Sequence, residues 1–210
     1  MAQIFQGADK QTQFQALVDD IKHHHCSLRD GCTQAVPGDG NINSQVVFIG
    51  EGPGKVEDQL GRPFVGPAGK LLEEGLEQIG LKREDVYITN VVKCRPPNNR
   101  DPLPTEVEEH KPFLERELAL IQPKLIVLLG RHALHWFLPS LSISQAHGSA
   151  KRSGNRVFFP IYHPAAALYD PRLRNTFLTD IKKIPLILQK IDELDAEPSV
   201  SVPSSQPTIF

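Results

Sequence analysis

Histidines and cysteines gather near the start of the chain with a spacing that can bind a metal ion. The segment KHHHCSLRDGC, residues 22–32, contains three consecutive histidines followed by Cys26 and Cys32, and the 210-residue sequence has one further cysteine, Cys94. Three thiols cannot all pair, and a reducing compartment disfavours disulfides, so we read them as free thiols or ligands. Thiolate and imidazole are ligands that zinc and iron accept. The segment is therefore a metal site, half of one, or a polar helix end without chemistry.

Polar residues also accompany three apolar runs of the sequence. Glu51 comes directly after QVVFIG, Asn90 lies within DVYITNVV, and His163 closes RVFFPIYH. Each alone is more often a turn or core residue than a catalyst. Together with Phe64 they offer a carboxylate, an amide that reads a base edge, an imidazole and a stacking ring. If the runs are parallel strands, these side chains meet at one edge of the sheet.

Glycines surround Glu51 in the segment GEGPGKVEDQLGRPFVG, where Gly52 and Gly54 allow a ligand to approach the backbone closely. A phosphate-binding loop is the first interpretation. A Walker loop, however, requires Ser or Thr after its lysine, whereas Lys55 is followed by Val56, and the dinucleotide-binding fingerprint fails as well. The turn therefore holds an acidic residue rather than a recognisable phosphate motif.

The elements that must position these residues alternate between strands and helices. Helical periodicity predicts helices over residues 67–80 and 105–121, between runs rich in β-branched and aromatic residues. That alternation predicts an α/β fold with three layers, α/β/α, and a central, mainly parallel four-stranded sheet. The predicted strands span residues 45–50, 85–92, 124–130 and 156–163.

Helices are also predicted near both ends of the chain. An apolar stripe over residues 14–21 predicts a helix that runs into the histidines, and a stripe over residues 177–191 predicts one closing helix despite Pro185. Residues 1–194 are therefore expected to form a single domain. The Ser- and Pro-rich residues 195–210 are expected to be a disordered tail.

The composition predicts a cytoplasmic protein. The chain has 40% hydrophobic and 23% charged residues, which is ordinary for a globular domain. No apolar run approaches membrane-spanning length, and the first residues lack the basic and apolar regions of a signal peptide. We expect a monomer without a membrane partner. Because the formal net charge is -2, a nucleic-acid partner must be held by a local basic patch.

Four motifs together resemble those of family 4 uracil-DNA glycosylases, the iron–sulfur branch of the uracil-DNA glycosylase superfamily: GEGPG, GRPFVG, YITNVVKCRPPNNRDP and YHPAA. The resemblance covers residues 23–190. It implies a DNA-repair hydrolase that flips deoxyuridine out of the helix and hydrolyses its N-glycosidic bond. Such an enzyme releases uracil and leaves an abasic site for base excision repair. Its partner is uracil-containing DNA, single- or double-stranded.

The resemblance also implies roles for the residues at the strand ends. The implied catalytic residues are Glu51, Asn90 and His163, and the implied substrate-binding residues are Gly52, Gly54, Phe64, Asn90 and His163. Asn90 donates to uracil O4 and accepts from N3–H, His163 stabilises the uracil anion, and Glu51 orients the attacking water. Phe64 stacks on the flipped base. Gly52 stands where the best-known branch of the superfamily carries an aspartate.

DNA contacts are expected from two groups of basic residues and one apolar side chain. Beside the second predicted strand, the candidates for phosphate contacts are Lys93, Arg95 and Arg100. Around the last loops they are Lys151, Arg152, Arg172 and Arg174. Leu168 lies where the family places its DNA-penetrating loop, so it is the candidate wedge.

For the metal site, the resemblance implies a 4Fe–4S cluster on four cysteines. In this sequence the four ligand positions hold His23, Cys26, Cys94 and His110, so imidazoles replace two thiolates. Three outcomes stay open: a cluster, since histidine replaces two cysteines in some iron–sulfur proteins; zinc, which suits a Cys2His2 set; or no metal. The substitute donors nearby are His24, His25 and Cys32.

Two other functions remain alternatives. One is a protein that binds uracil or damaged DNA without catalysis, or traps it covalently. A covalent relative of the family uses a histidine in the loop after its second strand, but this loop reads RPPNNRDP, so turnover is predicted. The other alternative is a nucleotide-binding α/β protein that uses the GEGPGK turn.

Overall fold

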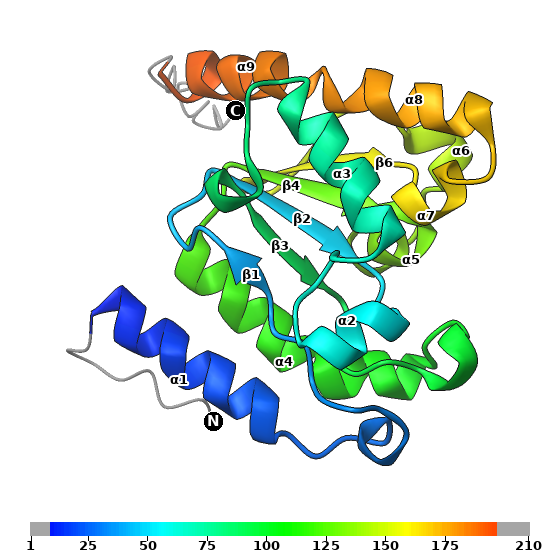
Figure 1. The fold of residues 1–210 in the computed structure, drawn as a ribbon. Coiled ribbons are helices and arrows are strands. Elements are labelled where there is room, and N and C mark those ends of the chain that lie inside the picture. Colours follow the sequence, from blue (N-terminus) through cyan, green and yellow to red (C-terminus); the bar gives the residue numbers. More distant parts are fainter. Residues whose placement is uncertain (1–8, 197–210) are drawn as a thin grey trace, which may run out of the picture.

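A six-stranded sheet lies at the centre of the structure, a computed structural model that describes residues 9–196 (Figure 1). The strands are β1 (Asp39–Gly40), β2 (Val46–Gly50), β3 (Tyr87–Asn90), β4 (Leu125–Leu129), β5 (Lys151–Ser153) and β6 (Arg156–Ile161). Their order is β1-β3-β2-β4-β6-β5. The four inner strands are parallel, while β1 and β5 pair antiparallel at the two edges. The predicted parallel strands are confirmed, and the sheet has two strands more than predicted.

The two edge strands are too short to leave a pattern in the sequence. β1 has two residues, and β5 is the exposed triplet KRS. Strands of this length show no alternating apolar face, so periodicity cannot reveal them. They are recognised only through their pairing with β3 and β6.

Helices cover both faces of the sheet, which confirms the three-layer prediction. α1 and α4 lie on one face, and α3, α8 and α9 lie on the other (Figure 1). The helices are α1 (Lys10–His23), α2 (Lys55–Leu60), α3 (Pro67–Glu77), α4 (Pro104–Ile121), α5 (Gly130–Phe137), α6 (Ile143–Ala146), α7 (Pro164–Ala167), α8 (Pro171–Ile181) and α9 (Ile184–Ala196). Short 3-10 helices in the loops are η1 (Arg29–Gly31), η2 (Arg83–Asp85) and η3 (Pro97–Asn99).

Alternate side chains of the inner strands pack against opposite helical layers. In β2, Phe48 joins the apolar cluster under α3 and α8, whereas Val47 and Ile49 join the cluster under α4. All three side chains are fully buried. Because both faces are covered, the strand is apolar at every position rather than at alternate positions. The sheet is thus a packed platform, and its loops carry the polar residues.

The carboxyl ends of the parallel strands are aligned by the register of the sheet. Gly50 of β2 pairs with Asn90 of β3, and Leu129 of β4 pairs with Ile161 of β6. The residues that directly follow these strands therefore lie along one edge of the sheet. This is the edge at which open parallel sheets bind their ligands.

The closing helix is divided in two, which corrects the prediction of one continuous helix. α8 ends at Ile181 and α9 begins at Ile184. Pro185 has no N–H to donate to the carbonyl four residues earlier, and its ring crowds that carbonyl, so α8 ends before it and Pro185 lies in the first turn of α9. Ile181 and Ile184 are nevertheless fully buried, as the apolar stripe predicted.

The end of α9 shortens the predicted tail. α9 continues through Asp195 and Ala196, which were expected to be disordered. The remaining tail residues, 197–210, lie outside the described residues. Within residues 9–196, none of the helices combines the length and the apolar character required to cross a membrane.

Candidate functional site

A cavity of about 230 Å³ opens at the carboxyl ends of β2, β3 and β6. Its walls include all of the residues predicted to recognise the base or to catalyse its release: Glu51, Gly52, Gly54, Phe64, Asn90 and His163. These residues come from three separate segments of the chain. The aligned strand ends bring them together, as the reading of parallel strands implied.

The side chain of Asn90 is an unpaired polar group in this cavity. It is 1% exposed, and neither Oδ1 nor Nδ2 has a hydrogen-bond partner among the described residues. Leaving such a group unpaired costs about 1–3 kcal/mol, so buried amides are nearly always hydrogen-bonded. A Cβ at Gly50 would lie 2.5 Å from Asn90 Oδ1 and from a ring carbon of Phe64, so only glycine leaves them room. The amide therefore offers one acceptor and a pair of donor hydrogens to a ligand.

Lys93 supports Asn90 from within the core, which corrects its prediction as a DNA contact. Its side chain is 1% exposed, and its ammonium lies 2.6 Å from a carboxylate oxygen of Glu117 in α4. It also donates to the Asn90 carbonyl at 2.9 Å and to Thr89 Oγ1 at 2.7 Å. Burial lowers the pKa of Lys93, and the charge of Glu117 opposes this shift. The sequence position beside a strand end was read correctly, but the side chain turns inward.

The carboxylate of Glu117 is fully satisfied in this buried network. One oxygen accepts from Tyr87 Oη at 3.0 Å and from the Gly38 amide at 3.1 Å. The other accepts from Thr89 Oγ1 at 2.9 Å and from Lys93. A buried ion pair is stable only when such additional hydrogen bonds offset the loss of solvation. The network fixes the end of β3, and with it the position of the Asn90 backbone.

Phe64 forms one wall of the cavity with its backbone in the left-handed region, at a φ of 52°. Its ring is buried, and the ring centroid lies 5.7 Å from that of His163. The Phe64 carbonyl accepts from Arg83 Nη1 at 2.8 Å. A Cβ at Gly69 would lie 1.8 Å from the same carbonyl, so α3 can approach this loop only with glycine there. These contacts hold a strained residue in place and keep its ring at the site.

His163 is held in one tautomer by the start of α7. The amide of Ala165 donates to His163 Nδ1 at 3.1 Å, so the proton of the neutral ring is on Nε2. Burial lowers the pKa of His163 to about 4, and the charge of His132 lowers it further. At neutral pH the ring is therefore an uncharged hydrogen-bond donor. A Cβ at Gly130 would lie 2.8 Å from the His163 Cβ, so this close approach also needs glycine.

Glu51 lies beside three residues that the sequence analysis missed. Its carboxylate is 3.5 Å from His132 Nε2, which lies 3.3 Å from Asp101 Oδ1 and 2.9 Å from Arg131 Nε. Burial raises the pKa of Glu51, whereas the charge of His132 opposes this shift. His132 lies two residues after the run KLIVLLG, which contains β4. The rule that singled out the other strand ends would have found it there.

The other basic residues predicted near the second strand differ in how freely they can bind phosphate. Arg100 lines the cavity, but its guanidinium contacts both carboxylate oxygens of Glu106, at 2.5 and 2.8 Å. Arg95 donates to Asn99 Oδ1 at 2.6 Å. Arg172, from the later loops, has a side chain that is 92% exposed. Of these three residues, Arg172 presents its charge most openly to solvent.

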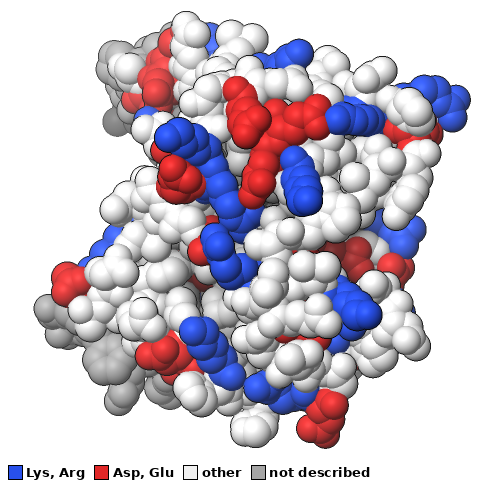
Figure 2. All heavy atoms as spheres, viewed as in Figure 1, with Lys and Arg blue, Asp and Glu red and all other residues white. Residues whose placement is uncertain are grey.

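The remaining basic candidates lie on edge strand β5 and on α8. Lys151 is exposed, while Arg152 is 3.2 Å from Asp195 of α9 and Arg174 is 2.5 Å from Glu74 of α3. On the face of the molecule in Figure 2, Lys and Arg side chains are interspersed with Asp and Glu. That face shows no continuous basic surface, in keeping with the net charge of -2.

Two neighbouring apolar side chains project between α7 and α8. Leu168, the predicted wedge, is 37% exposed, and Tyr169 is 90% exposed. The sequence analysis missed Tyr169. Its signal was weak, because a single tyrosine beside a leucine occurs on many protein surfaces.

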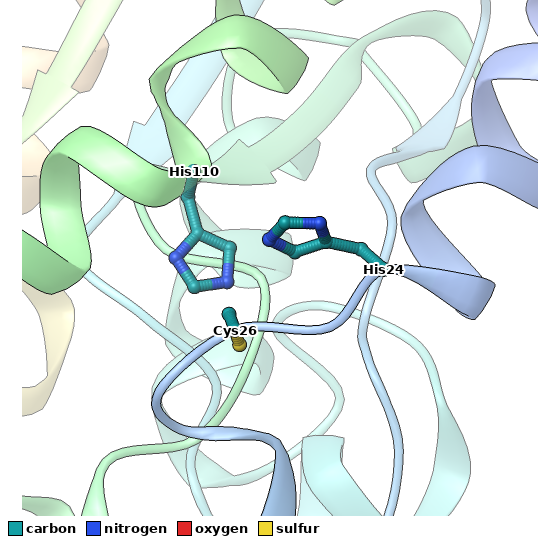
Figure 3. A group of neighbouring side chains, drawn as sticks. All are labelled: His24, Cys26 and His110. Carbon is teal, nitrogen blue, oxygen red and sulfur yellow. The ribbon is translucent and has the colours of Figure 1, made fainter.

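A second group of polar side chains lies where α1 ends, away from the strand-end cavity. Figure 3 shows His24, Cys26 and His110 pointing toward one another, with His110 on α4. One donor atom from each lies within 4.8 Å of the other two. His23, the predicted ligand, is exposed and donates from Nδ1 to the Asp19 carbonyl at 2.8 Å. The structure thus puts His24 in the place predicted for His23.

His24 rather than His23 faces the other donors because of the way α1 ends. His24 caps the helix in an extended conformation, with φ of -63° and ψ of 136°. The chain therefore leaves the helix at this residue and directs the ring toward α4. His23 is still helical, and its ring folds back on its own helix. Sequence spacing cannot tell these two neighbours apart.

The two thiols predicted with the histidines also lie here, together with the third. Cys94 is fully buried, in the same apolar cluster as Cys26 and Cys32. Burial raises the pKa of Cys94, and the neighbouring thiols raise it further. A 4Fe–4S core stands between its ligands and binds each through a different iron. Four cysteine thiolates hold such a core, whereas the donors that converge here are two imidazoles and one thiol, so the donor set does not suit the cluster implied by the resemblance.

With the fold and both sites described, comparison with known proteins gives the class of the chain. Residues 37–183 match the family model described as the uracil DNA glycosylase superfamily. The chain therefore belongs to this superfamily.

Curated relatives narrow the class to one branch. A type-4 uracil-DNA glycosylase of Archaeoglobus fulgidus is 52% identical over 168 residues, which cover 76% of this chain and 84% of that protein. Type-4 enzymes of Sulfurisphaera tokodaii and Saccharolobus solfataricus are 47% and 42% identical, over 76% and 80% of this chain and 77% and 83% of theirs. The branch is thus the type-4 family, as the sequence motifs indicated.

Proposed function

We propose that this protein is a DNA-repair glycosylase that removes uracil from DNA. It flips deoxyuridine into the strand-end cavity and hydrolyses the N-glycosidic bond, which releases uracil and leaves an abasic site. The observation that carries this proposal is the buried, unpaired amide of Asn90. The names of the type-4 relatives support it.

Uracil supplies the hydrogen-bonding partners that the Asn90 amide lacks. Nδ2 donates to uracil O4, and Oδ1 accepts from uracil N3–H. Cytosine presents an amino group and an unprotonated N3 at the same positions. The Asn90 amide would then place its donor against a donor and its acceptor against an acceptor. A site built this way rejects the wrong base strongly, because buried groups are then left unpaired. Phe64 covers the face of the bound base.

The cavity is sized for a small ligand. Its volume of about 230 Å³ is below the roughly 300–1,000 Å³ of sites that bind drug-sized molecules. Two carboxylates, those of Glu51 and Glu57, also line it. They repel a phosphate group, and Glu57 already accepts from the amides of Val65 and Gly66 at 3.1 and 2.8 Å. These contacts favour an uncharged nucleobase over the nucleotide-binding alternative.

Cleavage of the bond leaves negative charge on uracil and positive charge on the sugar. His163 donates from Nε2 to uracil O2 as the anion develops, in the tautomer that Ala165 holds. The neutral ring serves this role without proton transfer, since its pKa of about 4 keeps it uncharged at neutral pH. Glu51 orients the attacking water and favours the sugar cation. His132 lies close enough to Glu51 to orient its carboxylate.

DNA outside the cavity is proposed to contact the exposed side chains around it. Arg172, Arg95 and Arg100 are the candidates for phosphate contacts, with Arg172 the most exposed, although its guanidinium lies 3.4 Å from Asp170. Leu168 and Tyr169 are exposed between α7 and α8 and are candidates to fill the space left by the flipped base. The same proposal treats residues 1–194 as one glycosylase domain that acts as a monomer in the cytoplasm.

The proposed reaction does not use the histidine–cysteine cluster. A 4Fe–4S cofactor is implied by the family, but the convergence of two imidazoles with one thiol does not support it in this chain. Hydrolysis of a glycosidic bond needs no change of redox state, and the cavity residues supply the groups described above. The cofactor is therefore a separate question from the activity.

A uracil-containing oligonucleotide tests the proposal. Excision leaves abasic sites that break in alkali, and we expect this outcome with uracil and its absence with cytosine. A stable shifted complex without alkali-labile sites would instead identify a non-catalytic binder. A covalent adduct that survives denaturation would identify a trapping protein. Indifference to uracil would leave the nucleotide-binding alternative.

A further inference from the structure

The histidine–cysteine cluster has the donors and the spacing of a site for one metal ion. We propose that His24, Cys26, Cys94 and His110 bind a single structural zinc ion in place of the cluster expected from the family. The donor atoms of His24, Cys26 and His110 all lie within 4.8 Å of one another. A tetrahedral zinc ion, with bonds of about 2.0–2.3 Å, spaces its ligands about 3.3–3.8 Å apart. A small inward shift of these side chains closes the site.

His110 is prepared as a ligand by its own helix. Its Nδ1 donates to the Glu106 carbonyl at 2.7 Å, so the lone pair of the neutral ring is on Nε2. That Nε2 is buried and has no partner among the described residues, on a side chain that is 0% exposed. Metal-binding histidines typically donate their other ring N–H to a carbonyl or carboxylate in this way.

Glu106, whose carbonyl accepts from His110, is itself held in place by hydrogen bonds to its side chain. Its carboxylate accepts from Arg100 at 2.5 and 2.8 Å and from the Leu103 amide at 2.7 Å. The first turn of α4 is thereby held in place. The His110 ring thus has little freedom to turn its lone pair elsewhere.

His24 is the second histidine with an unpartnered ring nitrogen. Its Nε2 is buried without a hydrogen bond to any described residue. The ring is held edge-on between Phe113, at a centroid distance of 4.7 Å, and His110, at 5.6 Å. His23 and His25, its neighbours in the sequence, are both exposed. Of the three consecutive histidines, His24 alone is directed into the cluster.

Cys94 is the fourth ligand, because Cys32 is engaged elsewhere. The Cys32 thiol donates to the Arg29 carbonyl and accepts from the Arg29 guanidinium, both at 3.6 Å. Cys94 is fully buried in the same apolar cluster as Cys26, and its sulfur would move toward the three donors that lie within 4.8 Å of one another. Zn²⁺ bound to two thiolates and two neutral imidazoles has no net charge, which avoids the penalty of burying an ion. Cys2His2 is also a recurrent ligand set of structural zinc.

Such an ion would join three segments that are distant in the sequence. His24 and Cys26 follow α1, Cys94 follows β3, and His110 lies on α4. The ion would therefore tie the N-terminal segment to the sheet and to α4. The proposal does not depend on uracil excision, because none of the four ligands lines the strand-end cavity.

The metal content of the full chain, purified without a polyhistidine tag and without oxygen, tests the proposal. We expect about one zinc per chain, with neither iron nor acid-labile sulfide. In His24→Gln the zinc affinity should fall by more than the roughly 10- to 100-fold that loss of a supporting residue costs. His25→Gln is the matched control, since it removes the exposed neighbour, and it should keep its zinc. Both variants should be checked for folding by circular dichroism.

Three results would overturn the inference. Near-stoichiometric iron with sulfide would show that an iron–sulfur cluster occupies the site. Equal zinc content in His24→Gln and His25→Gln would place the ion elsewhere. Protein that stays free of zinc after dialysis against zinc chloride would show that the site binds none. None of these results bears on uracil excision, which is measured separately on oligonucleotides.

Cobalt substitution identifies the fourth ligand. Tetrahedral Co²⁺ has intense visible absorption and a thiolate-to-metal charge-transfer band whose strength grows with the number of thiolates. We expect the band to weaken in Cys94→Ser and to be unchanged in Cys32→Ser. The reverse result would overturn the assignment of Cys94. If Cys94→Ser does not fold, loss of the band in Cys32→Ser overturns it equally.

Discussion

The strand-end cavity and the histidine–cysteine cluster both contain buried polar atoms without partners, yet they differ in kind. In the cavity, Asn90 leaves an acceptor and a donor unpaired. In the cluster, His24 and His110 leave nitrogen lone pairs beside thiols. A donor next to an acceptor suits an organic ligand with the opposite pattern, whereas converging lone pairs suit a cation. The chemistry of the unpaired atoms, rather than their burial, distinguishes a substrate site from a metal site.

The two regions share one support. Lys93 donates to the Asn90 carbonyl, pairs with Glu117 of α4, and is followed in the chain by Cys94. The base-reading amide and the buried thiol are thus attached to the same stretch after β3. A substitution can therefore affect one of the two regions alone or both of them.

The largest effect is expected from Lys93→Met, which should disturb both regions. It leaves the Glu117 carboxylate buried without its counter-ion, and breaking such a pair costs about 3–5 kcal/mol of unfolding free energy. Hydrogen bonds from Tyr87, Thr89 and Gly38 keep the loss toward the lower value. Urea denaturation measures it, and both excision and zinc content should fall.

The exposed Lys70 of α3 provides the control for this variant. Lys70→Met should change the free energy of unfolding by no more than about 0.5 kcal/mol. A change below about 1 kcal/mol in Lys93→Met would show that the buried pair does not support the end of β3.

The next largest effect is expected from variants that change the strand-end cavity and leave the histidine–cysteine cluster unchanged. Asn90→Ala and His163→Ala should each lower the rate of uracil excision by about 10²–10³-fold, because each removes a contact to the developing uracil anion or to the base edge. Folding and zinc content should not change. Single-turnover kinetics on a uracil-containing oligonucleotide give the rates, with Asn155→Ala as a surface control. Near-normal rates in both variants would disprove the assignment of the site.

A smaller effect is expected from His132→Ala, which acts through Glu51. We expect excision to fall about tenfold through loss of orientation. Burial raises the pKa of Glu51 and His132 opposes this, so the variant should raise that pKa further. The ionised carboxylate is the active form, and it is lost as pH falls through its pKa. The acid limb of the pH–rate profile should therefore move to higher pH.

His135→Ala, one turn further along α5, is the matched control and should keep the wild-type profile. A parallel loss of rate at every pH in His132→Ala would mean that the histidine affects only the fold around Glu51. The same profile should show no effect of His163 above about pH 5, since its pKa is about 4.

The smallest effect is expected at the rim of the cavity. Tyr169→Ala should weaken excision from double-stranded DNA about fivefold, the cost of losing about 1 kcal/mol of stacking. Single-stranded substrate, which needs no replacement of a flipped base, should be affected less. Equal effects on both substrates would argue that Tyr169 does not fill the space that the flipped base leaves in the duplex.

The inner part of the fold was predictable because burial leaves a pattern in the sequence. The four parallel strands are continuous apolar runs, and each was predicted to within a few residues. β1 and β5 left no such pattern, and the break between α8 and α9 was hidden by an apolar stripe that continues across Pro185.

Much of the site was predictable for a related reason. Glu51, Asn90 and His163 lie at the ends of recognisable strands, and parallel register brings such ends together. His132 obeys the same rule, but none of the four motifs that carry the family resemblance contains it. Lys93 lay at the right position, but its direction depended on Glu117, a partner 24 residues away.

The sequence by itself determined the four parallel strands of the sheet and most of the chemical groups at its edge, because both follow from local patterns of apolar and polar residues. Only the tertiary structure decided where individual side chains point. It directed His24 rather than His23 toward Cys26, buried Lys93 beside Glu117, and left the Asn90 amide unpaired. Each of these outcomes depends on contacts between segments far apart in the chain, which no local pattern encodes.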